Sequence, residues 1–202
     1  MPAKPGRRSD AEVVAAVHTA VVEEVLEVGM GKLTMDGIAQ RAGIAKTSLY
    51  RRWDNPQAVL LDAARSGFPQ DNAEPVLTGD MRRDLVEALR LMVAWMATPT
   101  AQVTGMILAE RARYPELAEA VYRDVFDPKG GRFTTMVLQH YAESGRINPA
   151  VVTPVVLDIG EALVLKYLLD AGSLPGDSTL IDIVDQVILP AVDRPDRPAP
   201  LR

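Results

Sequence analysis

The sequence of 202 residues contains no cysteine, which excludes disulfide bonds, thiol nucleophiles and thiolate metal ligands. Its only histidines, His18 and His140, do not form a pair at metal-ligand spacing. A glycine-rich phosphate loop and the signature of a nucleophile elbow are also missing. We therefore expect no catalytic residues, no bound metal and no cofactor, and we do not expect an enzyme.

Long apolar runs are absent as well. No segment reaches the roughly 18 uncharged apolar residues that a membrane-spanning helix requires. The basic start, with Lys4, Arg7 and Arg8, is not followed by the apolar core of a signal peptide. The composition, 48% apolar and 24% charged, is ordinary for a globular protein with a sizeable core. The sequence therefore predicts a cytoplasmic protein without membrane contact.

The net charge of -5 is unfavourable for contact with nucleic acid, but the charge is unevenly distributed. Residues 1–66 hold nine basic and eight acidic residues, whereas residues 67–202 hold thirteen basic and nineteen acidic residues. The stretch from Arg41 to Arg52 contains four basic residues and no acidic one. The sequence therefore predicts a local positive surface on a protein that is acidic overall.

The segment from Leu33 to Trp53 (LTMDGIAQRAGIAKTSLYRRW) has the pattern of two short helices joined by a tight turn. Thr34 suits a helix N-cap, and Gly43 can adopt the left-handed conformation that separates two helices. After the turn, Ile44, Leu49 and Trp53 form an apolar inner face, and the polar residues between them are left outside. This pattern is typical of a helix-turn-helix with a recognition helix.

Periodicity predicts an all-α fold. One helix from Ser9 or Asp10 to about Val28 precedes the helix-turn-helix, and another covers about 57–68. We expect a helix-turn-helix domain at 9–68, with three helices forming its core, and a helical bundle at 69–192 for ligand binding and dimerisation. Residues 1–8 and 193–202 are expected to be flexible tails. The predicted bundle helices are Met81–Ala97, Gln102–Ala112, Glu116–Phe126, Arg132–Ser144, Pro154–Asp170 and Thr179–Val192.

The segment Thr34 to Leu60 resembles the DNA-binding domain of the TetR family of transcriptional regulators. A weaker resemblance to this family extends over residues 9–192 and includes the motif ERARYPEL at Glu110 to Leu117. The resemblance implies a homodimer that binds double-stranded operator DNA through the small domain. It also implies a small-molecule effector, of unidentified structure, bound in the large domain. Most members of this family are repressors that leave a pseudo-palindromic operator when the effector binds.

The resemblance also assigns roles to residues of this chain. Thr34 matches a phosphate contact at the start of the first motif helix, where its N-cap role is compatible with that contact. Lys46, Thr47 and Ser48 match the first turn of the recognition helix, where side chains reach base edges. The remaining expected DNA contacts, to phosphate and the groove wall, are Tyr50, Arg51 and Arg52.

Three positions depart from the family pattern. Ala45 stands where a capping hydroxyl is common, Asp36 is acidic where a basic residue would favour phosphate, and Pro56 replaces a common phosphate-binding lysine. Arg7 and Arg8 could supply phosphate or minor-groove contacts as a flexible arm, or they could simply belong to a charged terminus.

Two further sets of residues are predicted from the apolar helices of the C-terminal part. The helix at 154–170 is apolar on nearly all sides, and we expect a partner subunit, or alternatively the protein's own interior, to cover it. The predicted dimer interface comprises Val156, Ile159, Leu163, Val164, Tyr167, Ile183, Val184, Val187 and Ile188. The candidate ligand pocket, whose residues could equally be ordinary core, comprises Met92, Trp95, Met96, Met106, Tyr122, Phe126, Met136, His140 and Tyr167.

A second hypothesis belongs to a different functional class. The acidic total charge, together with Ala45 and Pro56, is also compatible with a helical small-molecule-binding or scaffold protein whose helix-turn-helix is vestigial. DNA binding separates the two hypotheses. The sequence does not identify the effector, the operator or the direction of regulation.

Overall fold

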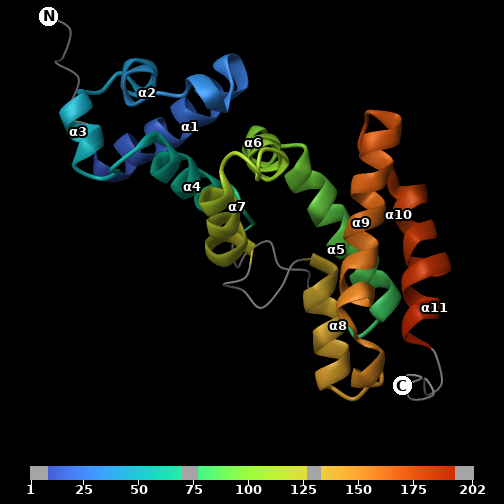
Figure 1. The fold of residues 1–202 in the computed structure, drawn as a ribbon. Helices are drawn as coiled ribbons and strands as arrows, with labels where there is room; N and C mark the ends of the chain where they lie inside the picture. Colours follow the sequence, from blue (N-terminus) through green and yellow to red (C-terminus); the bar gives the residue numbers. More distant parts are fainter. Residues whose placement is uncertain (1–8, 70–76, 127–132, 194–202) are drawn as a thin grey trace, which may run out of the picture. The chain divides into compact units, whose positions relative to one another are not determined.

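The computed structural model describes residues 9–69, 77–126 and 133–193, and within these ranges the regular structure is helical. Figure 1 shows the helices in chain order. The predicted tails and the basic residues Arg7 and Arg8 lie outside the described ranges, apart from Asp193. No single helix within the described ranges is long and apolar enough to span a membrane, although α5 (Met81–Met96) and α6 (Pro99–Ala109) pass the test of length and composition as a bent pair. The helices and helical turns are α1 (Asp10–Val28), η1 (Met30–Lys32), α2 (Met35–Ala42), α3 (Lys46–Tyr50), α4 (Pro56–Gly67), α5 (Met81–Met96), α6 (Pro99–Ala109), α7 (Pro115–Val121), η3 (Tyr122–Phe126), α8 (Phe133–Glu143), η5 (Pro149–Val151), α9 (Pro154–Ala171), α10 (Asp177–Ile183), η6 (Val184–Ile188) and α11 (Leu189–Val192).

The chain forms two compact units. The first unit comprises 1–68 and 98–125, and the second comprises 69–97 and 126–202. The first unit therefore contains α6 and α7 in addition to the helix-turn-helix, because α6 packs against both α1 and α4. The functional division at residue 68 stays a prediction.

In the first unit, α1 provides the main apolar stripe. Ser9 and Glu12 form a capping box at its start, which satisfies backbone donors of the first turn. Val17, Val21 and Val25 recur at helical spacing and are fully buried against α2 and α4. The packing of α1 against α2 thus fixes the position of the first helix of the helix-turn-helix within this unit.

The predicted helix Gln102–Ala112 is displaced in the structure. Its counterpart, α6, begins at Pro99 and ends at Ala109. The Thr98 hydroxyl accepts a hydrogen bond from the amide of Ala101 at 3.2 Å, and Pro99 suits the first helical position because it has no N–H to satisfy. The sequence interpretation overlooked this capping pair, so its starting residue was wrong.

The second unit is a bundle in which α5 packs against α8 and α9, and η6 lies beside α9 (Figure 1). A Cβ atom at Gly160 of α9 would lie 2.8 Å from Cδ1 of Ile188, so glycine allows this close approach. The predicted helix Thr179–Val192 begins earlier, at Asp177, and passes through a π-helical turn at Val184–Ile188. Residue periodicity did not predict that turn.

A buried carboxylate also holds the second unit together. Asp84 is 1% exposed and accepts hydrogen bonds from the Tyr141 hydroxyl at 2.7 Å and from the amide and hydroxyl of Thr78. Burial opposes ionisation of Asp84, but these donors outweigh it and lower its pKa below the ordinary value. The same burial and the nearby carboxylate raise the pKa of Tyr141 to about 12. These bonds tie the start of α5 to α8.

Candidate nucleic-acid interface

The two helices of the motif are joined as the sequence predicts. The Thr34 hydroxyl accepts a hydrogen bond from the amide of Gly37 at 3.1 Å, which confirms the N-cap of α2. Gly43 has φ +65° and ends α2 in the left-handed conformation. The amide of Ile44 then donates to the carbonyl of Ala39 at 3.1 Å, which closes the turn.

The inner face of α3 is anchored in the core of the first unit. Leu49 is fully buried and Trp53 is 6% exposed. The indole Nε1 of Trp53 donates to Asp62 Oδ2 of α4 at 3.0 Å, and His18 Nε2 of α1 lies 3.1 Å from the same oxygen. The end of α3 is therefore connected to both α1 and α4, and its outer face has a fixed direction within this unit.

The residues expected to contact DNA lie mostly on the exposed side of α3 and the turn after it. Five of the six on α3 and this turn are exposed, Ser48 is half-buried, and Thr34 at the start of α2 is also exposed. Ser48, Arg51 and Arg52 line a hollow of about 520 Å³ together with Asp10 and Val13 of α1. The structure brings all of these groups together, apart from Thr34, on one short helix and its C-terminal turn. The five exposed residues are Lys46, Thr47, Tyr50, Arg51 and Arg52.

The positive surface predicted for this segment is largely paired with carboxylates of neighbouring helices. Lys46 Nζ lies 2.6 Å from Asp36 Oδ1 of α2, and this contact raises the pKa of Lys46 above its ordinary value. Arg52 is hydrogen-bonded to Asp10 at the start of α1. The positive surface predicted from the sequence is therefore partly compensated, and the count of charges along the segment did not reveal the acidic partners. Within the described ranges, Arg51 shows no such partner.

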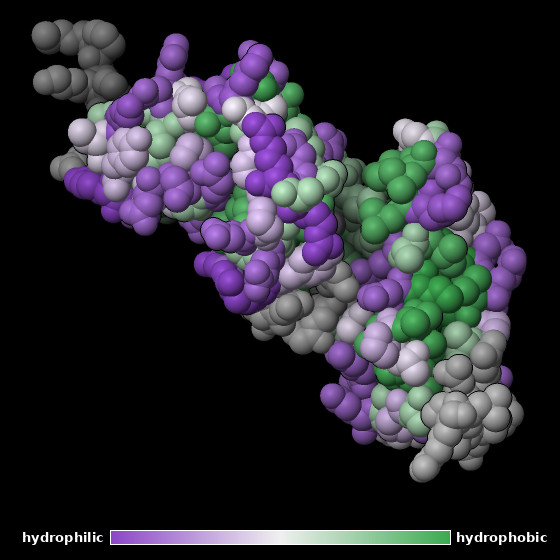
Figure 2. All heavy atoms as spheres, in the orientation of Figure 1, coloured by the Kyte–Doolittle hydropathy of each residue, from purple (hydrophilic) through white to green (hydrophobic). Residues whose placement is uncertain are grey.

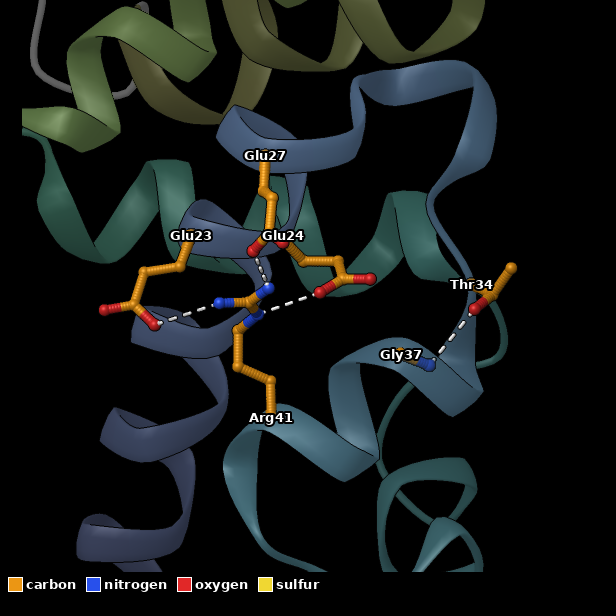
Figure 3. A network of polar contacts seen from close by, with 6 residues as sticks. All are labelled: Glu23, Glu24, Glu27, Thr34, Gly37 and Arg41. Carbon is orange, nitrogen blue, oxygen red and sulfur yellow. Dashed lines mark hydrogen bonds and ion pairs between the residues drawn. The ribbon is translucent and has the colours of Figure 1, made fainter.

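Arg41 of α2 points toward α1, where three glutamates surround it (Figure 3). Its Nε donates to Glu24 at 2.8 Å, Nη2 donates to Glu27, and Nη1 lies 3.9 Å from Glu23. These carboxylates raise the pKa of Arg41 above its ordinary value. A methyl group at Gly37 would collide with Glu24, so α1 and α2 pack closely here. Arg41 joins two helices and does not add to the surface of α3.

The residues predicted for a ligand pocket are divided between the two units. Met106 and Tyr122 belong to the first unit, and the other members belong to the second. In the second unit, the Trp95 ring lies 6.1 Å from the rings of Phe126 and Phe133 (centroid distances), and Met92 is buried. The three rings form an apolar cluster. Met96 and Met136 are half-buried, whereas Tyr122, His140 and Tyr167 are exposed on their helices.

The predicted dimer residues divide by burial. The side chains of Val164, Val184 and Ile188 are 0% exposed, and Ile183 is 7% exposed, in a single protomer. These four belong to the core of the second unit and have almost no exposed surface in the protomer, and their assignment to an interface stays a prediction. The half-buried or exposed members are Val156, Ile159, Leu163, Tyr167 and Val187.

Sequence reasoning missed two features. A hollow of about 530 Å³ lies between the start of α4 and the α6–α7 junction, and neither it nor the hollow beside α3 is lined by the predicted pocket residues. The exposed apolar residues of α9, namely Val155, Leu165 and Leu169, were left out of the predicted interface. Among the described residues, no group of three or more acidic or histidine side chains is placed to hold a metal ion.

Comparison with known families and proteins places this geometry in context. The family model for bacterial regulatory proteins of the tetR family matches residues 19–66. The model for the tetracyclin repressor-like C-terminal domain matches residues 75–187, which is more than half of the chain. Both units therefore contribute to the match.

Individual proteins agree with the family models. The chain is 27% identical over 168 residues to an uncharacterised HTH-type transcriptional regulator of Mycobacterium tuberculosis, covering 83% of this chain and 82% of that protein. It is 27% identical over 179 residues to a DNA-binding transcriptional repressor of Mycobacteroides abscessus, with coverages of 87% and 91%. The crystal structure of the TetR family regulator SCO0332 matches with a TM-score of 0.60 and 29% identity, over 88% of this chain and 97% of that one. The chain belongs to the TetR family of bacterial transcriptional regulators.

Proposed function

We propose that this protein is a homodimeric repressor that leaves a pseudo-palindromic operator when a small apolar effector binds. One observation carries the DNA part of the proposal. Leu49 and Trp53 are anchored in the core, and the opposite side of α3 presents donors to solvent. A short helix held in this way is the element that helix-turn-helix proteins place in the major groove.

Each exposed group has a role that its chemistry supports. Lys46 can donate to O6 and N7 of guanine, and the hydroxyls of Thr47 and Ser48 can pair with several bases. Tyr50 would donate to a phosphate oxygen, and the capped start of α2 at Thr34 would bind another. Arg51 and Arg52 would lie against the groove wall.

The homodimer is proposed to form through α9 and the adjoining α10 segment. Val155, Leu165 and Leu169 of α9 are 74%, 48% and 81% exposed. Figure 2 shows an apolar surface over this part of the second unit. Such a patch on a soluble protein indicates an interaction surface, and a two-fold dimer would cover it with its own copy. The half-buried Ile159 and Leu163 would contribute to the edge of this interface.

The effector is proposed to bind in the second unit near the apolar cluster of Trp95, Phe126 and Phe133, whose rings would suit an apolar molecule. Because two recognition helices must match half-sites about 34–36 Å apart, a change in the tilt of α4 would spoil DNA binding. Effector and DNA would then weaken each other's affinity by the same factor. The relative from Mycobacteroides abscessus is named a repressor, which supports the proposed direction of regulation.

A second candidate remains, a helical binding or scaffold protein with a vestigial helix-turn-helix. The carboxylates that pair with Lys46 and Arg52 favour it, because paired cations have less attraction for phosphate. Competition binding separates the candidates. The assay uses labelled duplexes from the region upstream of the protein's own gene. It measures, at several salt concentrations, how much unlabelled random duplex is needed to displace each of them from the protein.

The repressor proposal expects at least one upstream duplex to bind far more tightly than random DNA, with an affinity that falls steeply as salt rises. Lys46→Ala and Tyr50→Phe should both weaken that complex. Lys46→Ala should also reduce the discrimination between duplexes, because a base contact is lost. If random duplex displaces every upstream duplex equally well, the scaffold candidate is favoured.

A further inference from the structure

The cations at both flanks of α3 are held by carboxylates from other helices. Lys46 at the start of α3 pairs with Asp36 in the first turn of α2, at 2.6 Å. Arg52, just after α3, pairs with Asp10 in the first turn of α1. By helical spacing, Thr47, which has no charge, lies on the outer face between these flanks. The cation at each flank of α3 therefore has a carboxylate partner within the protein.

These pairs are not needed to build the motif. The side chains of Asp36 and Asp10 are 71% and 75% exposed, so neither carboxylate fills space in the core. The positions of α2 and α3 are already fixed by the turn at Gly43 and by the buried Leu49. A carboxylate in such a place acts mainly through its charge, and an asparagine would keep its shape.

A carboxylate and a phosphate compete for the same cation. Random DNA is bound almost entirely through phosphates, so a lysine already paired with aspartate contributes less to that binding. Lysine has three donor hydrogens, and Lys46 can keep one on Asp36 while the others reach a base edge. Its ammonium also lies 5.8 Å from the centroid of the Tyr50 ring. The pair thus holds a flexible side chain in one direction before DNA arrives.

We infer that Asp36 and Asp10 are specificity-determining residues, which restrain Lys46 and Arg52 from binding the phosphates of random DNA. The inference rests on the proposed DNA-binding function. The carboxylates repel DNA phosphates and therefore lower the affinity for every duplex. They lower it most for random DNA, because phosphate contacts are the only attraction there. Discrimination between operator and random DNA therefore increases at the expense of total affinity.

The test uses the full chain carrying Asp36→Asn, titrated against a random-sequence duplex and against the tightest-bound duplex from the upstream region. Asp54→Asn is the matched control. It removes the same charge from an exposed residue that follows α3, and within the described residues no ion pair involves Asp54. Asp36→Asn should tighten binding to random duplex by about 1.5- to 5-fold more than the control does, the range expected for an exposed ion pair. The upstream duplex should gain less, so the ratio of the two affinities should fall.

A double variant shows whether the effect passes through Lys46. In a Lys46→Ala background, Asp36→Asn should give no more gain on random duplex than Asp54→Asn gives. If Asp36→Asn matches the control in the wild-type background, or if its extra gain persists without Lys46, the inference is refuted. The proposed function is tested separately by the unmodified chain. If that chain fails to discriminate the upstream duplexes from random DNA, the function fails, and the inference falls with it.

Discussion

Leu169 of α9 provides a quantitative test of the proposed dimer. Full burial of a leucine side chain stabilises by about 1.5–3 kcal/mol, and Leu169 is 81% exposed in the protomer, so most of this gain is still available. A two-fold dimer contains two copies of the residue. Leu169→Ser should therefore weaken the dimer by at least about 2 kcal/mol, which is about 30-fold in its Kd.

Sedimentation equilibrium of the full chain, from nanomolar to micromolar concentrations, measures this dissociation constant. Leu26→Ser provides the control, because Leu26 lies on α1 in the first unit and is 43% exposed. The control should leave the association constant unchanged. If Leu169→Ser leaves the dimer as strong as the control does, the exposed face of α9 is not the interface. If the unmodified chain sediments as a monomer throughout, the homodimer itself is refuted.

Three further predictions concern the interior and the packing of the motif. The pKa of Asp84 is lower than that of an aspartate in the unfolded chain, so its stabilising contribution should be complete above about pH 4 and should decline as pH falls further. Urea unfolding of the wild type and of Asp84→Asn measures this contribution, and the difference between their free energies of unfolding should shrink toward low pH. Tyr141 has a raised pKa of about 12, so the stability that it contributes should be constant below about pH 10 and decline above it, a loss that Tyr141→Phe should not show. Leu49→Ala should destabilise the first unit by about 2–5 kcal/mol in urea unfolding followed by the fluorescence of Trp53 in a Trp95→Phe background, and a cost below about 1 kcal/mol would mean that α3 is not anchored as described.

The Arg41 contacts give one more prediction, on DNA affinity. Glu24→Gln removes a negative charge from the DNA-binding unit, and by charge alone it should strengthen binding. Because Glu24 holds Arg41 and thereby joins α2 to α1, we expect weaker binding to the upstream duplex instead. Gain of affinity in anisotropy titrations would show that Arg41 does not position α2.

Local features of the motif could be predicted from the sequence because their causes are local. Thr34 and Gly43 act within three or four residues of their own positions, through a capping bond and a left-handed turn. Leu49 and Trp53 follow from helical spacing. A short-range pattern therefore located α2 and α3 closely, although it could not show how their charges are paired.

The charge pairs could not be predicted because their partners are distant in the sequence. Arg52 pairs with Asp10 across 42 positions, and Arg41 pairs with glutamates 14 to 18 positions away. A count of charges along the chain treats such residues as independent. Only the packing of α1 against the helix-turn-helix brings them together, and that packing changes the interpretation of the basic stretch from a phosphate-binding surface to a partly compensated one.

The dimer surface could be predicted only in part, because the sequence does not show which side of a helix is covered within the protomer. Because α9 is apolar on nearly all sides, periodicity does not show which side faces the core of the protomer. The structure places Val164 inside, and Leu165 and Leu169 outside. The π-helical turn at Val184–Ile188 shifts the register of the following residues and adds to the same difficulty.

A hydroxyl-radical footprint of the full chain on the DNA upstream of its own gene tests the central claim most directly. Two recognition helices in a symmetric dimer should protect two half-sites related by approximate two-fold symmetry and spaced by about one helical turn, roughly 34–36 Å. Tyr50→Phe should weaken both half-sites equally. Protection of two symmetric half-sites is the result that the proposed function predicts. Uniform cleavage at protein concentrations that leave random DNA unbound would contradict it.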